Sequence, residues 1–228
     1  MRSLAALLLL TIVSASSAFA ETVEAAPGLH VTKKAYPVPT NEQPFYGFAP
    51  KTPFLATVDE KFIADVVQNF GSRQRAFDEA LKRGWSAFLS GDLVTASRRF
   101  NQAYLLAPER SGVYHGFAAL VHTRFNDMDY ADELYRIALK QPEPSQFLRA
   151  DYGRFLLMVK RPADARPMLE QAVVDAPKFE SAWSNLAWAR LQTGDQSGAC
   201  AAVVEAEKLA TSENVKSDIA LLKGAAKC

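Results

Sequence analysis

The chain has 228 residues, of which 26 are Lys or Arg and 25 are Asp or Glu. A protein that binds nucleic acid or an anionic membrane surface through charge alone needs an excess of basic residues. This balance argues against both kinds of partner. The chain is long enough to bury a sizeable core, and nothing in its length requires a second globular domain.

Residues 1–20 have the pattern of a secretory signal peptide. Arg2 precedes an apolar run at 4–13, and small residues lead to Ala18, Phe19 and Ala20 before Glu21. The run is too short to anchor the chain in a bilayer, and no cysteine at the cleavage point offers a site for a lipid. We predict that cleavage near Ala20 releases a periplasmic or secreted protein with no membrane insertion.

Segment 21–56 is predicted to be extended, because proline at this density prevents helix formation and weakens strand pairing. The segment also has an unusual aromatic load for a linker. Two interpretations stay open. The segment packs along the rest of the chain as an arm, or it is a flexible tether or a strip that orders on a partner. The prolines are Pro27, Pro37, Pro39, Pro44, Pro50 and Pro53, and the aromatic residues are Tyr36, Phe45, Tyr46, Phe48 and Phe54.

Residues 57–71 are predicted to form a short helix that caps the folded body. Thr57 followed by Glu60 fits a capping box, and Gly71 stops the helix. Ser72 can cap the helix that follows. The apolar face of the short helix consists of Phe62, Ile63, Val66, Val67 and Phe70.

A ladder of alanines recurs with a nearly fixed period in the remainder of the chain. Ala96, Ala131, Ala165 and Ala199 are 35, 34 and 34 residues apart. A period near 34 predicts a helical repeat array, whose units bury their apolar faces only by stacking. Each alanine is followed by a large residue four places on and by another alanine seven places on, which lines one helical face. The large residues are Phe100, Tyr135, Leu169 and Val203, and the second alanines are Ala103, Ala138, Ala172 and Ala206.

This pattern resembles the tetratricopeptide repeat, in copies at about 76–110, 111–144, 145–179 and 180–211. A small residue lets the two helices of each copy approach closely, at Gly84, Ala118, Gly153 and Ala187. The turn of the second copy, near 125–129, has one extra residue and no glycine. The resemblance implies an all-α, right-handed α-solenoid of about four helix hairpins over 72–211, with a capping helix at each end and no sheet.

Residues 212–228 are predicted to form the C-terminal capping helix, which Ser212 caps and which carries an apolar stripe at Val215, Ile219 and Leu222. An antiparallel capping helix brings Cys228 level with Cys200. Exported chains meet oxidising conditions, so the two cysteines are a candidate disulfide. The alternative is two unrelated thiols.

In this family the first helix of each repeat lines a concave groove. The tryptophans there suit apolar side chains or sugar rings, the arginine suits a carboxylate, and the asparagine suits a peptide backbone. The two histidines are too far apart in sequence to share a zinc ion as helical neighbours. The alternative for Trp85 and Phe88 is a place in the core. The candidate groove residues are Trp85, Phe88, His115, His122, Arg154, Asn185, Trp188 and Gln192.

The sequence contains no nucleophile motif, phosphate-binding loop, dinucleotide-binding turn or zinc-protease motif. We therefore predict a protein that is not an enzyme and that uses no cofactor or metal. The resemblance implies a scaffold, monomeric or weakly self-associating, that binds another envelope protein or peptide in assembly of a pilus, secretion or surface-polymer system. A carbohydrate- or cell-wall-binding subunit that uses the groove tryptophans is the alternative.

Overall fold

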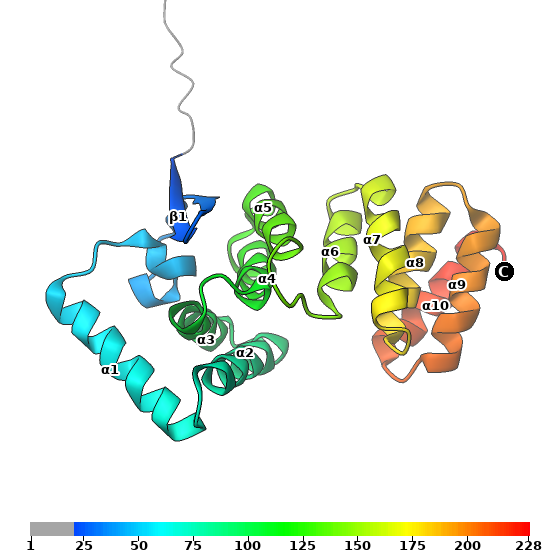
Figure 1. The fold of residues 1–228 in the computed structure, drawn as a ribbon. Coiled ribbons are helices and arrows are strands. Elements are labelled where there is room, and N and C mark those ends of the chain that lie inside the picture. Colours follow the sequence, from blue (N-terminus) through cyan, green and yellow to red (C-terminus); the bar gives the residue numbers. More distant parts are fainter. Residues whose placement is uncertain (1–20) are drawn as a thin grey trace, which may run out of the picture.

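The structure is a computed structural model that describes residues 21–228 (Figure 1). The predicted signal peptide lies outside the described residues. Four antiparallel helix pairs stand in a row, and α1 and α10 flank them. The predicted all-α solenoid is confirmed. The pairs are α2 (Arg73–Leu89) with α3 (Leu93–Leu106), α4 (Ser111–Leu120) with α5 (Met128–Ala138), α6 (Leu148–Met158) with α7 (Pro162–Asp175), and α8 (Glu180–Gln192) with α9 (Gln196–Leu209).

The alanine ladder lies in the core, as predicted, and each of its members is at most 1% exposed. Small residues on the first helices make room for the large residue of the ladder. A Cβ atom on Gly84 would lie 2.5 Å from Phe100 Cε1, and one on Gly153 would lie 2.4 Å from Leu169 Cγ. Close approach of the two helices therefore requires glycine at these positions.

The extra residue of the second repeat is absorbed as one turn of π-helix, η3 (Val121–Phe125), which continues directly from α4. Asn126 then takes a left-handed conformation with φ of 54°, which asparagine tolerates better than most residues. The Asp127 carboxylate accepts a hydrogen bond from the Tyr130 amide and caps α5. The insertion stays local, so the spacing is 35 residues from Ala96 to Ala131 and returns to 34 in the repeats that follow.

The N-terminal helix α1 (Pro53–Phe70) begins one turn earlier than predicted. The Thr52 hydroxyl accepts a hydrogen bond from the Leu55 amide, and Pro53 occupies the first turn, where its missing N–H costs nothing. The predicted capping box at Thr57 is therefore wrong, since Thr57 lies inside the helix and donates to the Pro53 carbonyl. The predicted stop at Gly71 is confirmed, with φ of 77°.

Only the C-terminal part of α1 covers the first repeat. Ile63, Val66 and Phe70 pack against the core, whereas Phe54 is 74% exposed. Figure 1 shows α1 leaning away from the row of helix pairs at the end that joins it to the preceding segment. The helix is a cap at one end and an exposed connector at the other.

Segment 21–52 is a docked arm, which decides between the two interpretations of the proline-rich region. It contains two strands, β1 (Thr22–Ala26) and β2 (Leu29–Thr32), and two short 3-10 turns, η1 (Thr40–Glu42) and η2 (Pro44–Phe48). The strands pair antiparallel, so the prediction of no sheet is wrong here. Pairing is possible because Pro27 lies in the turn between the strands and removes no ladder hydrogen bond.

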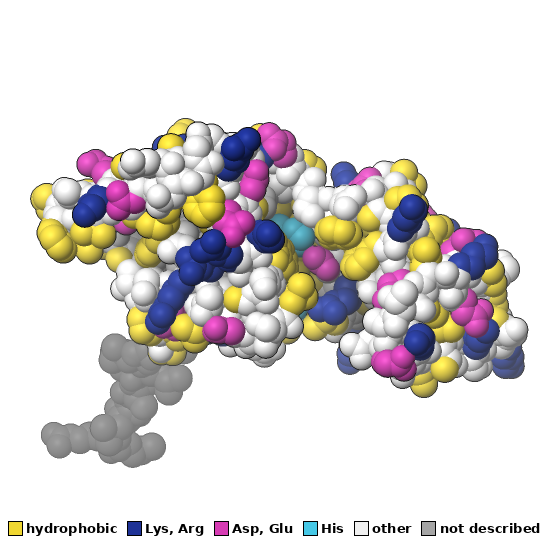
Figure 2. Space-filling model, turned by 90° about the horizontal axis from the view of Figure 1, so that it is seen from below, with side chains coloured by type: hydrophobic (Ala, Val, Ile, Leu, Met, Phe, Trp, Pro, Cys, Tyr) yellow, Lys and Arg dark blue, Asp and Glu magenta, His cyan; other side chains and the backbone are white. Residues whose placement is uncertain are grey.

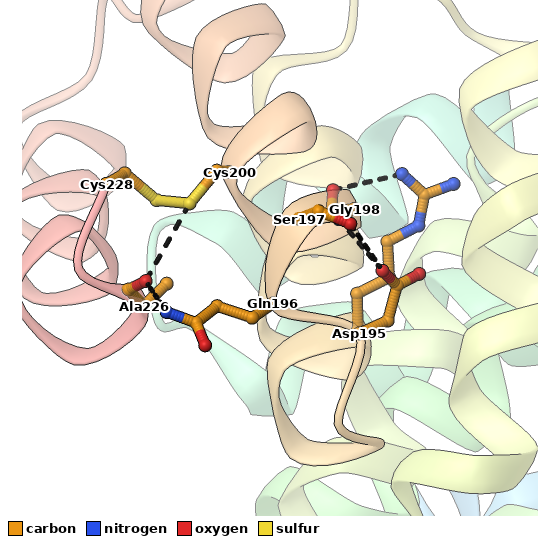
Figure 3. The surroundings of a disulfide bond; sticks show 8 residues. Asp195, Gln196, Ser197, Gly198, Cys200, Ala226 and Cys228 are labelled. Atoms are coloured by element: carbon orange, nitrogen blue, oxygen red, sulfur yellow. Dashed lines mark hydrogen bonds between the residues drawn. A yellow bond between two sulfur atoms is a disulfide. The ribbon is translucent and has the colours of Figure 1, made fainter.

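The C-terminal helix α10 (Glu213–Ala226) and the disulfide are both confirmed. Ser212 caps the helix by accepting from the Val215 amide. The Cys200 and Cys228 sulfur atoms are 2.06 Å apart, and the two Cα atoms are 5.6 Å apart. Nearby, the Gln196 side chain donates to the Ala226 carbonyl at 2.6 Å (Figure 3). The end of α10 is thus tied to the start of α9.

The linker between α5 and α6 is the longest connection between helix pairs in the described part of the chain. It runs over 139–147, whereas the other two linkers between pairs run over 107–110 and 176–179. It divides the row into an N-terminal half, ending with α5, and a C-terminal half, beginning with α6 (Figure 1). Across residues 21–228, no helix has both the length and the apolar character needed to cross a membrane.

Candidate partner-binding groove

The first helices of the four pairs carry a row of side chains one position after the small residue of each repeat. The row consists of Trp85 on α2, Ala119 on α4, Arg154 on α6 and Trp188 on α8. Figure 2 shows a hollow between the two halves of the molecule, with a histidine and an acidic side chain at its base. Ala119 is the small and buried member of the row.

Trp85 and Phe88 are half-buried and belong partly to the core. The Trp85 ring centroid lies 5.4 Å from that of Phe100, 5.6 Å from that of Phe88 and 4.6 Å from that of His115. The two interpretations of these residues are therefore not exclusive. One side of each ring fills the first repeat, and the rest remains accessible at the N-terminal end of the groove.

His115 is buried and joins the second repeat to the third. Its Nε2 atom lies 2.9 Å from Asp151 Oδ2, across from α4 to α6. Its Nδ1 atom is also buried and has no hydrogen-bond partner in the protein. His115 lies beneath the groove surface, so its part in the groove is to hold Asp151 and to support Trp85.

His122 is also buried, one turn before the end of η3, with its ring 5.6 Å from that of Phe155. Burial, together with the positive charge of Arg154, lowers the pKa of His122 to about 4, and the negative charge of Asp151 partly opposes this shift. The imidazole is therefore neutral at ordinary pH. Neither histidine reaches a partner directly without movement, and both form the base of the groove.

The remaining predicted residues are more accessible. Arg154 and Gln192 are exposed, and Asn185 and Trp188 are half-buried on α8. Ser184, one position before Asn185, is buried, with its hydroxyl 3.5 Å from Asp218 Oδ2 of α10. Arg154, Asn185 and Trp188 are thus accessible at the surface, and their part in binding stays a prediction.

The arm lies on another side of the molecule. Its contacts fall on the second helices, α3 and α5, and on the side of α4 that faces them. Phe117 contacts the arm, whereas His115, two positions away on α4, faces α6. Within residues 21–228, no hydrogen bond or aromatic contact of the arm reaches Trp85, Phe88 or Arg154. The arm leaves the row of groove residues uncovered.

One groove residue and most of the arm's docking surface could not be recognised from the sequence. Asp151 has no periodic signature, and only its distance to His115 marks it. Glu42, Asn101 and Arg124 bind the arm to the repeats, yet each looks like an ordinary surface residue in the sequence. The aromatic load of the arm was the one available signal. Residues 21–228 contain no group of three or more side chains placed to hold a metal ion.

No protein-family model matches the chain, and no curated protein matches it. Solved structures do. The structure reported in the functional characterisation of Pseudomonas aeruginosa pilF superposes with a TM-score of 0.58 at 22% identity, over 68% of this chain and 73% of that chain. YrrB, described as a TPR protein with an unusual peptide-binding site, gives a TM-score of 0.51 at 14% identity, over 68% of this chain and 84% of that chain.

Yeast Tom70 gives a TM-score of 0.52 at 19% identity, over 78% of this chain but only 44% of that chain, so the match spans less than half of Tom70. Identities this low establish the fold alone. The helix pairs, the buried alanine ladder and these three similar structures lead to the same conclusion: the chain has the fold of the tetratricopeptide repeat proteins.

Proposed function

We propose that the protein is a non-catalytic scaffold or adaptor that holds a segment of another protein in its groove. The observation that carries this proposal is the row of side chains on successive first helices, in which two tryptophans flank a small residue and an arginine. Solenoids of stacked repeats present surfaces of this kind to extended partners. The peptide-binding site ascribed to YrrB supports this use of the fold.

The chemistry of the row favours a polypeptide with apolar side chains and one carboxylate. The exposed guanidinium of Arg154 can donate two parallel hydrogen bonds to a carboxylate. Asn185 can both donate to and accept from a peptide backbone. Trp188 offers an apolar face next to these polar groups. Binding needs no bond making or breaking, so the proposal assigns no catalytic residue.

The proposed location is the cell envelope, in assembly of a pilus, a secretion system or a surface polymer. The signal-peptide pattern supports export, and the disulfide is typical of oxidising compartments. Mass spectrometry of the protein from a periplasmic fraction should find Glu21 at the N-terminus. A protein that keeps residues 1–20 and stays in the cytosol would contradict this location.

The groove is tested by site-specific photo-crosslinking in the living cell. A photoreactive residue at Gln192, on the groove side of α8, should capture a defined envelope protein. The same residue at Val174 is the control, because Val174 is exposed on a second helix. Equal capture from both positions would mean that the groove is not the binding surface.

The captured protein is then measured against purified variants. Arg154→Ala and Asn185→Ala should each weaken binding by at least about 1 kcal/mol, roughly five-fold, and leave the melting temperature nearly unchanged. Trp188→Ala should weaken binding more, as central aromatic anchors often do. Unfolding by Trp188→Ala, with full binding by the folded fraction, would place Trp188 in the core. Binding of a polysaccharide that depends on Trp85 and Trp188 would favour the carbohydrate alternative.

A further inference from the structure

The arm is held on the repeats in the way that a recognition site holds a peptide. Phe45 is the anchor and is only 2% exposed. Its ring centroid lies 4.5 Å from that of Phe117, 5.1 Å from that of Tyr104 and 5.7 Å from that of Tyr114. Helices α3 and α4 thus form an aromatic pocket, and the Phe45 side chain fills it.

Asn101, whose side chain is fully buried on α3, grips the backbone of the same segment. Its Nδ2 atom donates to the carbonyls of Asn41 and Gln43 at 3.1 and 2.8 Å. Its Oδ1 atom accepts from the Tyr46 amide at 3.1 Å. Both N–H donors of the amide and its acceptor oxygen are thus directed at the backbone of the arm.

Two arginines hold the acidic side chain of the segment. Glu42 Oε1 lies 2.7 Å from Arg98 Nη2, and Glu42 Oε2 lies 2.6 Å from Arg124 Nη2. Arg124 is itself positioned by a hydrogen bond from Nη1 to Ser97 Oγ at 2.7 Å. Hydrogen bonds from Arg124 and Arg98 keep the pKa of Glu42 below its usual range. The carboxylate is therefore charged when the arm is docked.

The backbone of the segment does not favour this conformation by itself. Phe45, Tyr46 and Phe48 have φ of 56°, 54° and 51°, in the left-handed region that residues with a side chain rarely occupy. Several such residues in succession persist only where surrounding contacts impose them. The pocket, the asparagine and the arginines therefore select a conformation that the free segment seldom adopts.

The connection between the arm and the repeats leaves the arm free to exchange. The arm is continuous with the N-terminal end of α1, where Phe54, Leu55 and Val58 are exposed and no residue of the helix is fully buried. Release of the arm would uncover its own docking surface without breaking a helix pair. Exchange of an identical element between copies requires a connector of this kind.

We propose that the surface formed by α3, α4 and η3 is a second peptide-binding site, distinct from the groove, that the chain's own segment 41–46 occupies. The ligand it recognises is a glutamate followed three residues later by phenylalanine, in a left-handed turn. The occupant in trans is the same segment of a second copy of this chain. Under conditions that release the arm, two copies exchange arms and form a dimer.

The first test uses the full chain and a labelled synthetic peptide of residues 36–50. Phe45→Ala in the chain empties the aromatic pocket. Fluorescence anisotropy should therefore show that the wild-type peptide binds this variant at least ten-fold more tightly than it binds the unaltered chain. In the unaltered chain the arm competes with the peptide at a high effective concentration. Phe54→Ala is the matched control, since it removes an exposed phenylalanine and should leave the site closed. Peptides carrying Phe45→Ala or Glu42→Gln should bind at least ten-fold more weakly.

The second test is complementation between two full-length variants. The Phe45→Ala chain has an intact site and a defective arm. The Asn101→Ala chain has a defective site and an intact arm. An equimolar mixture should form a concentration-dependent heterodimer in sedimentation velocity, and each variant alone should sediment as a monomer. Separate monomers in the mixture would overturn exchange between copies.

Equal binding of the wild-type and a scrambled peptide to a helical Phe45→Ala chain would overturn the site itself. Should Phe45→Ala lose helical circular dichroism, Glu42→Gln replaces it in both tests. Loss of helix by both variants, with no recovery on adding the peptide, would also overturn the proposal, because the arm would then be core.

Discussion

The two halves of the molecule are built from the same kind of repeat, but different side chains fill their cores. In the N-terminal half, the arm through α5, the largest fully buried side chains are rings, among them Phe45, Phe100, Phe117 and Tyr135. In the C-terminal half, Leu169 and Val203 stand at the ladder positions that Phe100 and Tyr135 occupy in the first half, and Phe155 is a fully buried ring. The alanine ladder thus sets the distance between helices. The remaining volume is filled mainly by aromatic rings in the first half and by aliphatic side chains in the second.

The halves also close their ends differently. The first half is covered by an arm whose contacts reach 55 residues or more along the chain, from Tyr46 to Asn101 and from Ala25 to Tyr104. The second half is closed by α10 and a disulfide that spans 28 residues. Only the second half is built wholly from contacts between neighbours in sequence, as expected of a repeat array.

The largest expected effect is at the ladder position that differs most between the halves. Phe100→Ala removes a fully buried ring and should lower the free energy of unfolding by about 3–5 kcal/mol. Val203→Ala, at the same position of the fourth repeat, should cost only about 2 kcal/mol. Urea denaturation measures both values. Equal losses would mean that the rings of the first half contribute no more than the aliphatic side chains of the second.

The disulfide comes next. Cys200→Ser with Cys228→Ser should reduce stability by about 3.6 kcal/mol in the chain-entropy treatment of a loop of this length. Hydrogen exchange should speed up in α9 and α10 and stay unchanged in α2 to α5, because contacts in an array are local. Faster exchange throughout the chain would show that the two halves unfold together.

A bulky residue in the ladder is expected to cost about 1–3 kcal/mol, because the core has no space for it. Ala165→Phe makes this change at a fully buried position of α7. Ala163→Phe, two residues earlier and exposed, is the matched control and should change the melting temperature little. A similar loss of melting temperature from both variants would argue that α7 is not placed as described.

An effect that depends on pH is expected at His122, at the junction of the halves. Its pKa in the folded state is about 4, below the ordinary value of 6.5, so the unfolded chain binds the proton first as the pH falls. Stability should therefore fall between about pH 6.5 and pH 4, by roughly 1 kcal/mol per pH unit. Urea denaturation across this range should show a smaller slope for His122→Gln than for the unaltered chain. Equal slopes would mean that another group dominates.

The sequence alone determined the parts of the protein that depend on neighbouring residues. The ladder from Ala96 to Ala206 predicted four helix pairs because each repeat packs on the next at a fixed spacing. Gly71, Ser72 and Ser212 mark helix ends because a cap is a contact within one turn. The disulfide followed from the antiparallel course of the last two helices.

Only the tertiary structure decided how the arm lies and which groove residues are accessible. The conformation of Phe45 depends on Asn101 and the ring of Phe117, which no local pattern connects to it. Likewise His115 is buried because Asp151, 36 residues away, accepts its hydrogen bond. Periodicity specifies which face of a helix is apolar. Which polar side chain lies buried on that face is decided by a partner from another element, since burial of a polar side chain costs free energy that a hydrogen bond from the partner offsets.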